Sequence, residues 1–459
     1  MNLIDHSPRE LMGHLEHAQA APPVFLWIER GMYQAFGSGE LSLRLLPLVC
    51  GVTALALFAA LAWRLFTAPV AVFATGLFAF CGRLIAYSAE VKQYEGDVLA
   101  GTLLLFLAAG PGDALRRLKR VTLVAAVLIW FSHSSVIVFA GISLALTIRC
   151  IRDGSKRALA ACAWNLAPAC SLGVLYMLSI RPQHNSYMFC GWAEDFPDFG
   201  RPLAFPAWLG NHVYQLANLP FKGLGALTLV LAALGCVWLV TAKQKERLTW
   251  FLAPIGLTLL ASCLKQYPFN GSRLTLFLLP GLLLLVAFGA EGLYCGLIPQ
   301  LRRWWWMAPL PLAAVAAVTA GWRVFVPQYR SHIRPVVAYV REHRQPGEAI
   351  YLVGEEPALA RQPDPGVFEG RHLEFLCYWR HPPAPVYDLW PGAAAVPEQR
   401  FWLAMPIDRS GNDAKSIAKM LADARTIADE VDHFDVKQGA AAYLFQRRQL
   451  SPPKAARRP

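Results

Sequence analysis

Long apolar runs separated by short basic loops repeat along this chain from Leu43 to Phe325. Each run has about 20 residues, which is the length an α-helix needs to cross the hydrocarbon core of a bilayer. Apolar residues make up 55% of the sequence and charged residues only 16%. This composition is too apolar for a globular protein whose whole surface faces water. The sequence therefore predicts an all-α polytopic membrane protein with about ten transmembrane helices.

The run 121–149 decides how many spans there are. Read as one helix, it would place the basic clusters at its two ends on opposite sides of the membrane. A pair of short helices turning at 132–135 places both clusters, and the other short basic loops, on the cytoplasmic side, as the positive-inside rule requires. Each half is short for a core about 30 Å thick, so the pair must be shielded by other helices or border a water-filled cavity. The predicted spans are then 43–63, 69–89, 95–110, 121–133, 134–149, 158–180, 223–241, 248–264, 274–296 and 307–325.

The charge and the cysteines indicate neither a nucleic-acid partner nor a metal site. The formal net charge of +12 would suit nucleic acid, but much of the Lys and Arg lies in loops between spans, so topology explains it and no nucleic-acid partner is predicted. The ten cysteines show no Cys/His ligand spacing, and most lie within apolar runs as small hydrophobic residues. His6, His14 and His17 crowd the N-terminus without an established ligand pattern, so a metal is not indicated and no cofactor is predicted.

The two ends of the chain differ from the middle, and the topology places both of them outside the cytoplasm. Residues 1–42 are predicted to form helices on the outer membrane surface, because apolar residues recur there at helical spacing. Residues 43–325 form the predicted transmembrane domain. Residues 326–450 alternate helical and strand-like patterns, which predicts a small extracytoplasmic α/β domain, and the basic tail 451–459 is predicted to be disordered. We expect the chain in a bacterial inner membrane.

In the C-terminal domain the individual elements can be placed from their patterns. Apolar residues at helical spacing predict a helix that opens at Arg334, and a second helix is predicted over 413–429. Runs of β-branched, aromatic and small apolar residues predict strands at 349–353, 400–404 and 440–445.

Acidic, basic and aromatic residues converge in the outward loop between the second and third predicted spans, where the candidates are Glu90, Lys92, Tyr94 and Asp97. Ionisable groups at the end of a span are unfavourable unless they pair or serve a function. We predict that Lys92 engages a phosphate, while Glu90 or Asp97 orients it or a sugar hydroxyl. An ordinary solvated loop is the alternative.

A second outward loop carries Lys265, Tyr267 and Arg273. Arg273 opens an apolar helix, where a cation is poorly placed against the helix dipole unless it has an anionic partner. A lipid phosphate is a natural partner because a guanidinium binds it bidentately; a topological or headgroup contact is the alternative. Residues 270–272 also fit the glycosylation sequon, a short pattern that often occurs by chance.

Two further segments are candidates for substrate contact. His133, at the turn of the short helix pair, could donate a hydrogen bond into an outer cavity, and a packed histidine is the alternative reading. The long outward loop 187–208 is rich in aromatic residues and contains Glu194, Asp195 and Asp198. Loops of that length are often functional, so we predict that it contacts a sugar or an acceptor.

These segments resemble the GT-C membrane glycosyltransferases, a superfamily that includes the protein O-mannosyltransferases, the lipid A aminoarabinose transferases and the lipopolysaccharide-core transferases of rhizobia. The resemblance lies in residues 19–27, 36–45, 90–94 and 267–273, and it covers roughly residues 1–325. It implies that a sugar passes from a polyprenyl-phosphate donor to a lipid, glycan or protein acceptor at the extracytoplasmic face, with inversion at the anomeric carbon.

Inversion needs a carboxylate that takes the acceptor's proton and cations that stabilise the departing phosphate. Lys92, Lys265 and Arg273 suit the second role. For the first, the resemblance implies an acidic pair directly after an initial transmembrane helix, and the printed sequence contains neither. We therefore expect an upstream span of about 20 residues that ends in Asp-Glu; otherwise Asp5 or Glu10 must supply the base.

Two functions of other classes compete with transfer. A transporter or flippase for a lipid-linked substrate predicts internal repeats and charged or broken helices at mid-membrane depth, and the sequence shows no convincing repeat. A non-catalytic membrane scaffold of the same superfamily is the reading that the missing acidic pair leaves open.

Overall fold

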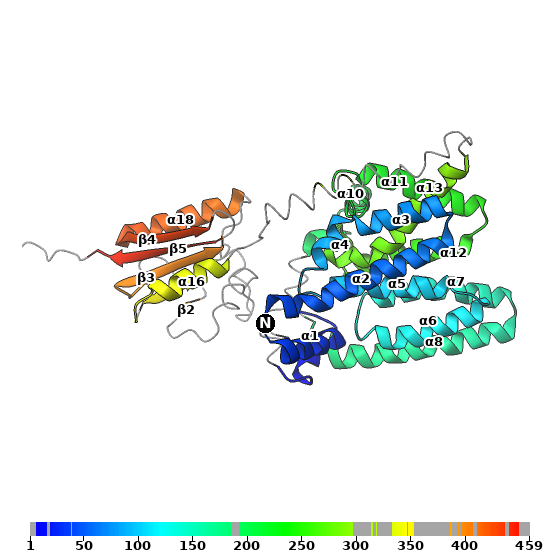
Figure 1. Cartoon of the computed structure of the whole chain (residues 1–459), viewed down its shortest axis with the longest axis horizontal. Helices are drawn as coiled ribbons and strands as arrows, with labels where there is room; N and C mark the ends of the chain where they lie inside the picture. Colours follow the sequence, from blue (N-terminus) through cyan, green and yellow to red (C-terminus); the bar gives the residue numbers. More distant parts are fainter. Residues whose placement is uncertain are drawn as a thin grey trace, which may run out of the picture. The chain divides into compact units, whose positions relative to one another are not determined.

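The chain forms two compact units, Leu3–Gly321 and Trp322–Pro459 with Met1–Asn2. Figure 1 shows the first as a bundle of helices and the second as a sheet with helices beside it. The computed structural model describes 6–15, 19–37, 39–184, 192–296, 333–346, 348–352, 386–387, 396–406, 411–436 and 440–448, with single residues 314, 318 and 393. Apart from 314 and 318, the predicted span 307–325 lies outside these residues, as does the tail 451–459.

Helices account for most of the larger unit. They are η2 (Glu10–Met12), α1 (Pro23–Phe36), α2 (Glu40–Leu65), α3 (Ala68–Ala79), α4 (Gly82–Tyr87), α5 (Tyr94–Ala108), α6 (Ala114–Leu128), α7 (Ser135–Arg152), α8 (Ser155–Leu175), α10 (Phe205–Asn218), α11 (Gly225–Thr241), α12 (Lys245–Cys263) and α13 (Leu279–Gly296). A π-helical turn, η3 (Tyr176–Ile180), extends α8, and the 3-10 helix η6 (Arg273–Leu278) leads into α13. Short 3-10 turns η4 (Ala193–Asp195) and η5 (Pro202–Ala204) precede α10.

The polytopic membrane fold is confirmed. Within the described residues, four helical segments are long and apolar enough to cross a membrane: Leu41–Leu65, Ser135–Arg152, Ser155–Ile180 and Arg273–Gly296. The helices α3 and α11 are apolar but shorter. Large apolar side chains also point outward, for example Leu159 on α8 and Val127 on α6, which are 74% and 73% exposed. Water would be a poor solvent for such a surface, since apolar area is unfavourable there by about 25 cal/mol per Å².

The run 121–149 is a pair of helices, as predicted. The turn between α6 and α7 lies at 129–134, and the two helices pack against each other and against α8 (Figure 1). Asp113 caps the start of α6, because its side chain accepts a hydrogen bond from the backbone amide of Arg116. The Asp113 cap explains where α6 begins, and the spacing of apolar residues explains why α6 and α7 are helical.

Two predicted helical segments are interrupted in the structure. The span 69–89 breaks into α3 and α4, because Cys81 adopts an extended backbone with φ −66° and ψ 104° and Gly82, a poor helix former, begins the next helix. The span 274–296 begins with the 3-10 helix η6 rather than as a continuous α-helix. In the described part of residues 1–39, α1 is a full helix, while η2 is a single 3-10 turn.

The helices α11 and α13 approach closely through two glycines. A Cβ atom at Gly235 would lie 2.0 Å from the backbone oxygen of Leu285, and one at Gly289 would lie 2.1 Å from that of Leu231. Small residues of this kind let membrane helices pack backbone against backbone, where lipid offers no hydrophobic driving force for association. The two glycines therefore bring α11 and α13 into close backbone contact.

In the smaller unit, the predicted α/β domain is confirmed. Its elements are α16 (Ile333–His343), β1 (Ala349–Leu352), β2 (Val386–Tyr387), β3 (Arg400–Pro406), α18 (Gly411–Ile427), β4 (Ala428–Val436) and β5 (Ala440–Arg447). The strand order is β2-β1-β3-β5-β4; β1 runs parallel to β2 and β3, and β5 runs antiparallel to β3 and β4. Apolar residues of α16 and α18 pack against the sheet in two separate clusters. Strand β4 is absent from the sequence prediction because its acid-rich edge sequence lacks the usual strand composition.

Candidate functional site

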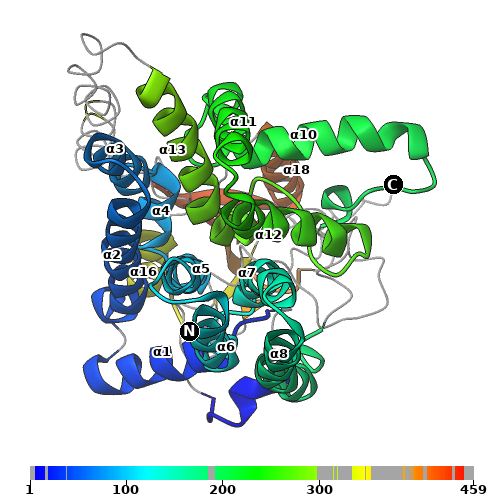
Figure 2. The same ribbon diagram turned by 90° about the vertical axis from the view of Figure 1, so that its right-hand side faces the viewer.

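The first turn of α5 carries buried ionisable residues. Glu95 and Asp97 are both buried although they are acidic, and Tyr94 is buried beside them. Helix α5 lies between α2 and α7 (Figure 2), so its first turn is enclosed by neighbouring helices. Acidic residues suit the positive end of the helix dipole. Glu90 and Lys92 lie half-buried in the turn that precedes the helix, where the amide of Lys92 donates to the carbonyl of Glu90 at 2.7 Å.

Asp97 holds the turn between α6 and α7. The Ser132 hydroxyl donates to its carboxylate at 2.6 Å and lies 3.2 Å from the Ser134 hydroxyl. The amide of Ser135 donates to the same Ser132 oxygen at 3.2 Å, which closes the turn. His133 projects from this turn half-buried, and its Nε2 atom is buried with no hydrogen-bond partner among the described residues. The predicted role of His133 in an outer cavity stays a prediction; the structure shows that its neighbour in the chain, Ser132, is bonded to Asp97.

The loop that contains Lys265 and Tyr267 meets the start of α5 at Tyr94. The guanidinium carbon of Arg273 lies 5.6 Å from the centroid of the Tyr94 ring, which is a cation–π contact. The Tyr267 hydroxyl donates to the backbone oxygen of Leu274 at 2.6 Å and so ties the loop to η6. Lys265 is exposed and has a left-handed backbone with φ 56°. The structure thus brings Tyr94, Asp97, Tyr267 and Arg273 to one end of α5 and leaves Lys265 on the surface of the loop.

Sequence reasoning missed Glu29. It lies on α1 and is only 2% exposed, and neither of its carboxyl oxygens has a hydrogen-bond partner among the described residues. Removal from water raises the pKa of this carboxyl to about 7. Glu29 follows Phe25 by one helical turn on the buried stripe of α1, so the helical spacing of the apolar residues could have revealed it.

Helix α1 is joined to the α6–α7 turn. The amide of Val24 donates to the backbone oxygen of Trp130 at 3.1 Å, and the Phe25 and Phe131 rings lie 6.3 Å apart. Across α2, Cys50 lies within electrostatic range of Glu29, Glu95 and Asp97. Three carboxyl groups from α1 and α5 therefore approach the same part of α2.

Of the two proton acceptors named from the sequence, Asp5 lies outside the described residues. Glu10 is 64% exposed and forms a capping box with Ser7: the Ser7 amide donates to the Glu10 carboxylate at 2.7 Å, and the Glu10 amide donates to the Ser7 hydroxyl at 3.3 Å. These bonds from Ser7 lower the pKa of Glu10. Among the described residues, no group of three or more His, Cys, Asp or Glu side chains could hold a metal ion.

The predicted acceptor-contact loop is described from Trp192 onward. Glu194 and Asp198 are exposed, while Asp195 is turned toward α10 and the Arg273 loop. Its carboxylate accepts a hydrogen bond from the Asn270 side chain at 2.6 Å and lies 3.8 Å from Nε2 of His212. Burial raises the pKa of Asp195, and the Asn270 bond opposes that effect.

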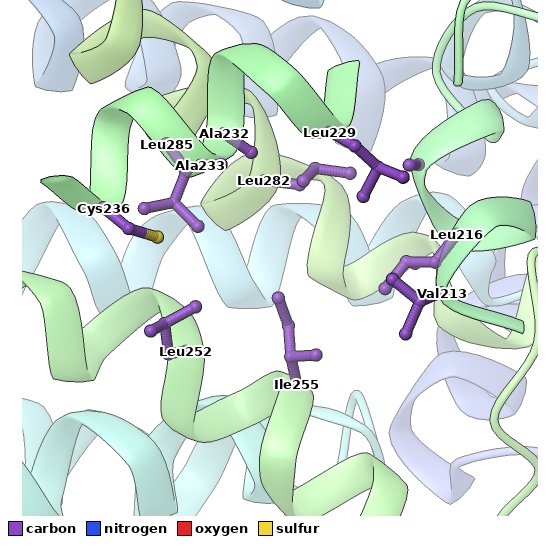
Figure 3. Close-up of a pocket in the computed structure, with 11 residues that line it drawn as sticks. Val213, Leu216, Leu229, Ala232, Ala233, Cys236, Leu252, Ile255, Leu282 and Leu285 are labelled. Atoms are coloured by element: carbon purple, nitrogen blue, oxygen red, sulfur yellow. The ribbon is translucent and has the colours of Figure 1, made fainter. Parts of the chain in front are cut away.

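An apolar cavity of about 250 Å³ lies among α10, α11, α12 and α13. Figure 3 shows that its lining side chains are hydrocarbon apart from one cysteine sulfur, Cys236. Such a lining offers no group that could move a proton or bind a charge. The cavity is therefore a poor candidate for binding a charged substrate group.

Comparisons with known proteins give a family model and two solved structures. Residues 20–149 match the family model described as dolichyl-phosphate-mannose-protein mannosyltransferase, a stretch that contains Glu29, Lys92, Asp97 and His133. Among solved structures, the chain is similar to ArnT from Cupriavidus metallidurans, in the apo state and bound to undecaprenyl phosphate. Both comparisons give 14% identity over 92% of this chain and 87% of that chain, with a TM-score of 0.37. No curated protein matches the sequence.

Proposed function

Residues 20–149 place the chain in the GT-C superfamily of membrane glycosyltransferases, and from this premise we propose that it transfers a sugar from a polyprenyl-phosphate donor. The acceptor is a lipid, glycan or protein at the extracytoplasmic face, and the anomeric carbon is inverted. The observation that carries the proposal is the meeting of Arg273, Tyr94 and Asp97 at one end of α5. A cation suited to a phosphate and a buried acidic network then lie in one place.

The donor phosphate is assigned to Arg273 and Lys92. The Arg273 guanidinium carbon lies over the Tyr94 ring, 5.6 Å from its centroid, and a guanidinium in such a cation–π contact can still direct N–H groups to a phosphate. Lys92 lies two positions before Tyr94 and adds a second cation. These charges stabilise the phosphate as the glycosidic bond breaks. Lys265, on the same loop as Arg273, meets the headgroup of the donor from the surface.

The acidic groups divide into orienting and proton-accepting roles. Asp97 is already engaged by Ser132, so it fixes the turn that carries His133, and Glu90 is the residue that orients a sugar hydroxyl. A carboxylate with a lowered pKa is a weak base, which disfavours Glu10. We assign the acceptor's proton to Glu29, whose pKa of about 7 suits a base that works near neutral pH. Asp5 is the alternative.

In the proposed step the electron pair of the acceptor oxygen forms a bond to the anomeric carbon, and the bond from that carbon to the phosphate oxygen breaks. The acceptor proton passes to the Glu29 carboxylate, and the polyprenyl phosphate leaves with the electron pair beside Arg273. No oxidant or reductant is needed. Glu29 is enclosed in the resting structure, so the acceptor must displace side chains of α1 to reach it.

The experiment follows a radiolabelled sugar. Membranes containing the protein are incubated with polyprenyl-phosphate sugars, and the label is traced into lipid, glycan and protein fractions. The Arg273→Ala variant should lose transfer, whereas Arg152→Ala, at the opposite end of α7 from the Ser132 turn, should retain it. Label that stays in the donor with the unmodified protein contradicts transfer and favours a scaffold; label that crosses the membrane still attached to its lipid favours a flippase.

A further inference from the structure

We propose that Asp195 is a positioning residue for Arg273, acting through the side chains of Asn270 and Ser272. The proposal rests on the proposed role of Arg273 as the ligand of the donor phosphate. Asp195 belongs to the loop that precedes α10, and Arg273 begins η6 after α12. A continuous set of hydrogen bonds joins these two segments, which are distant in the sequence.

The first link runs from Asp195 to Asn270. The Asn270 side-chain nitrogen donates to Oδ2 of Asp195 at 2.6 Å, and Asn270 is only 6% exposed. The backbone oxygen of Asp195 in turn accepts a hydrogen bond from the Ser262 hydroxyl, near the end of α12, at 3.0 Å. Asp195 is therefore anchored on one side and holds the amide of Asn270 on the other. A buried hydrogen bond to a charged group is among the stronger polar contacts.

The second link runs from Asn270 to the start of η6. The side-chain oxygen of Asn270 accepts from both the amide and the hydroxyl of Ser272, at 3.1 Å and 2.5 Å. The Ser272 oxygen then accepts from the amide of Leu274 at 3.3 Å, which caps η6. Arg273 lies between the capping residue and the capped amide. Its backbone is therefore fixed by the same bonds that fix Asn270.

Helix α10 packs against the loop that contains Asn270 and Ser272. A Cβ atom at Gly271 would lie 2.3 Å from the backbone oxygen of Gln215 on α10, so the loop packs directly against that helix. His212 of α10 is buried, with Nδ1 2.8 Å from the Trp208 backbone oxygen and Nε2 3.8 Å from Asp195. Since a carbonyl oxygen only accepts, Nδ1 carries a proton in this arrangement. Asp195, His212 and Asn270 thus form one packed junction.

The junction has two consequences. The sequon at 270–272 serves the fold, because its asparagine amide is already occupied and buried. More importantly, the position of Arg273 depends on a carboxylate in the loop that we expect to contact the acceptor. A displacement of about 1 Å in a positioning group can lower a rate about a hundredfold, so loosening this junction should weaken donor use without removing any group that touches the donor.

A reciprocal exchange tests the inference. Asp195→Ala removes the acceptor of the Asn270 bond, and Asn270→Asp places two carboxylates face to face; each should raise the KM for a polyprenyl-phosphate sugar about tenfold, the effect of about 1.4 kcal/mol. Combining Asp195→Asn with Asn270→Asp restores one donor and one acceptor, and Asp at 270 still accepts from Ser272. The double variant should return the KM to within about threefold of the original.

Controls separate positioning from general damage. Asp153→Ala changes an exposed carboxylate that follows α7, outside the proposed site, and should leave the donor KM unchanged. Ser272→Ala removes the cap but keeps the Asp195–Asn270 bond, so it should raise the KM while thermal unfolding changes little. In Ser272→Ala, which lies outside the loop 187–208, the KM for the acceptor should not rise. A loss of folded protein would instead lower the apparent kcat and leave both KM values unchanged.

The results distinguish this inference from the proposed function. If Arg273→Ala raises the donor KM but the double exchange fails to rescue Asn270→Asp, the positioning role of Asp195 is wrong and the phosphate role of Arg273 stands. Unchanged donor KM in both Asp195→Ala and Ser272→Ala also overturns it. If Arg273→Ala itself leaves donor use unchanged, the phosphate role fails first and the positioning role falls with it.

Discussion

The guanidinium carbon of Arg273 lies 5.6 Å from the centre of the Tyr94 ring. Tyr94 is the first residue of α5 and Arg273 is the first residue of η6, so the two come from separate parts of the chain. Tyr94 is also held by Tyr87, whose ring meets it edge-on at 5.4 Å. The aromatic platform is therefore fixed before any substrate arrives, which limits the directions in which Arg273 can present its N–H groups.

The phosphate clamp gives the first prediction. Arg273→Ala and Lys92→Ala should each lower donor use about tenfold or more, because a charge-assisted bond to the phosphate is lost. Arg273→Lys should recover only part of the activity, since an ammonium lacks the bidentate fork. Initial rates at varied donor concentration measure the effect. Full activity in both alanine variants would eliminate the clamp.

A second prediction concerns the pH dependence of stability. The pKa of Glu29 is about 7 in the folded protein and about 4.3 in an unfolded chain. Between these values the folded state holds the proton more tightly, so stability should fall as pH rises from about 4.3 to about 7 and then level off. Glu29→Gln should remove this part of the slope and raise the apparent Tm at pH 8.

The same variant tests catalysis. If Glu29 accepts the acceptor's proton, Glu29→Gln should lower kcat about a hundredfold or more although the protein is at least as stable. Thermal unfolding in detergent between pH 4.5 and 8, with transfer assays on the same preparations, gives both readings. A stable variant with undiminished kcat would move the base to another carboxylate, and Asp5→Asn and Glu10→Gln would then be compared.

The membrane topology makes a third prediction. Lys243 and Arg302 should face the cytoplasm, and residues after Pro327 should face outward, because the pair of short helices over 121–149 returns the chain to the same side. Reporter fusions at these three points measure the orientation. A cytoplasmic signal after Pro327 would contradict the predicted arrangement even though α6 and α7 are separate helices.

The close approach of α11 and α13 gives a fourth prediction. Gly235→Ala should destabilise the protein by about 1–3 kcal/mol, because the new methyl group would meet the Leu285 backbone oxygen and force the helices apart. Gly256→Ala on α12 is the matched control, since nothing lies within 4 Å of a Cβ atom there. Equal unfolding temperatures for the two variants would show that the helices can separate freely.

Much of the architecture is determined locally and could be predicted. The apolar runs identified a membrane protein. The basic clusters on either side of 121–149 predicted that this 29-residue run is a pair of helices and not one long helix. Periodicities of 3.6 and 2 placed α16, β1, β3 and β5 within a few residues of their observed bounds. Each of these inferences uses information carried by residues near one another in the chain. Strand β4 escaped because its charged residues suit a solvent-facing edge and not a typical strand.

The site was predicted only in part, for a physical reason. Lys92, Tyr94, Asp97, Tyr267 and Arg273 could be named because ionisable and aromatic residues stand out at the ends of apolar spans. That Asp97 bonds Ser132, or that Asn270 bonds Asp195, could not be predicted, because each bond joins segments whose approach depends on how whole helices pack.

The burial of Glu29 can be predicted from the sequence, but its environment cannot. Glu29 lies one helical turn after Phe25 in the sequence, and this spacing places it on the buried face of α1. Its lack of a hydrogen-bond partner among the described residues depends on α1, α2 and α5 together. The sequence by itself determined which residues each helix presents; tertiary packing decided which of them lose water and which find a partner, because desolvation and hydrogen bonding depend on distances between helices and not on positions along one.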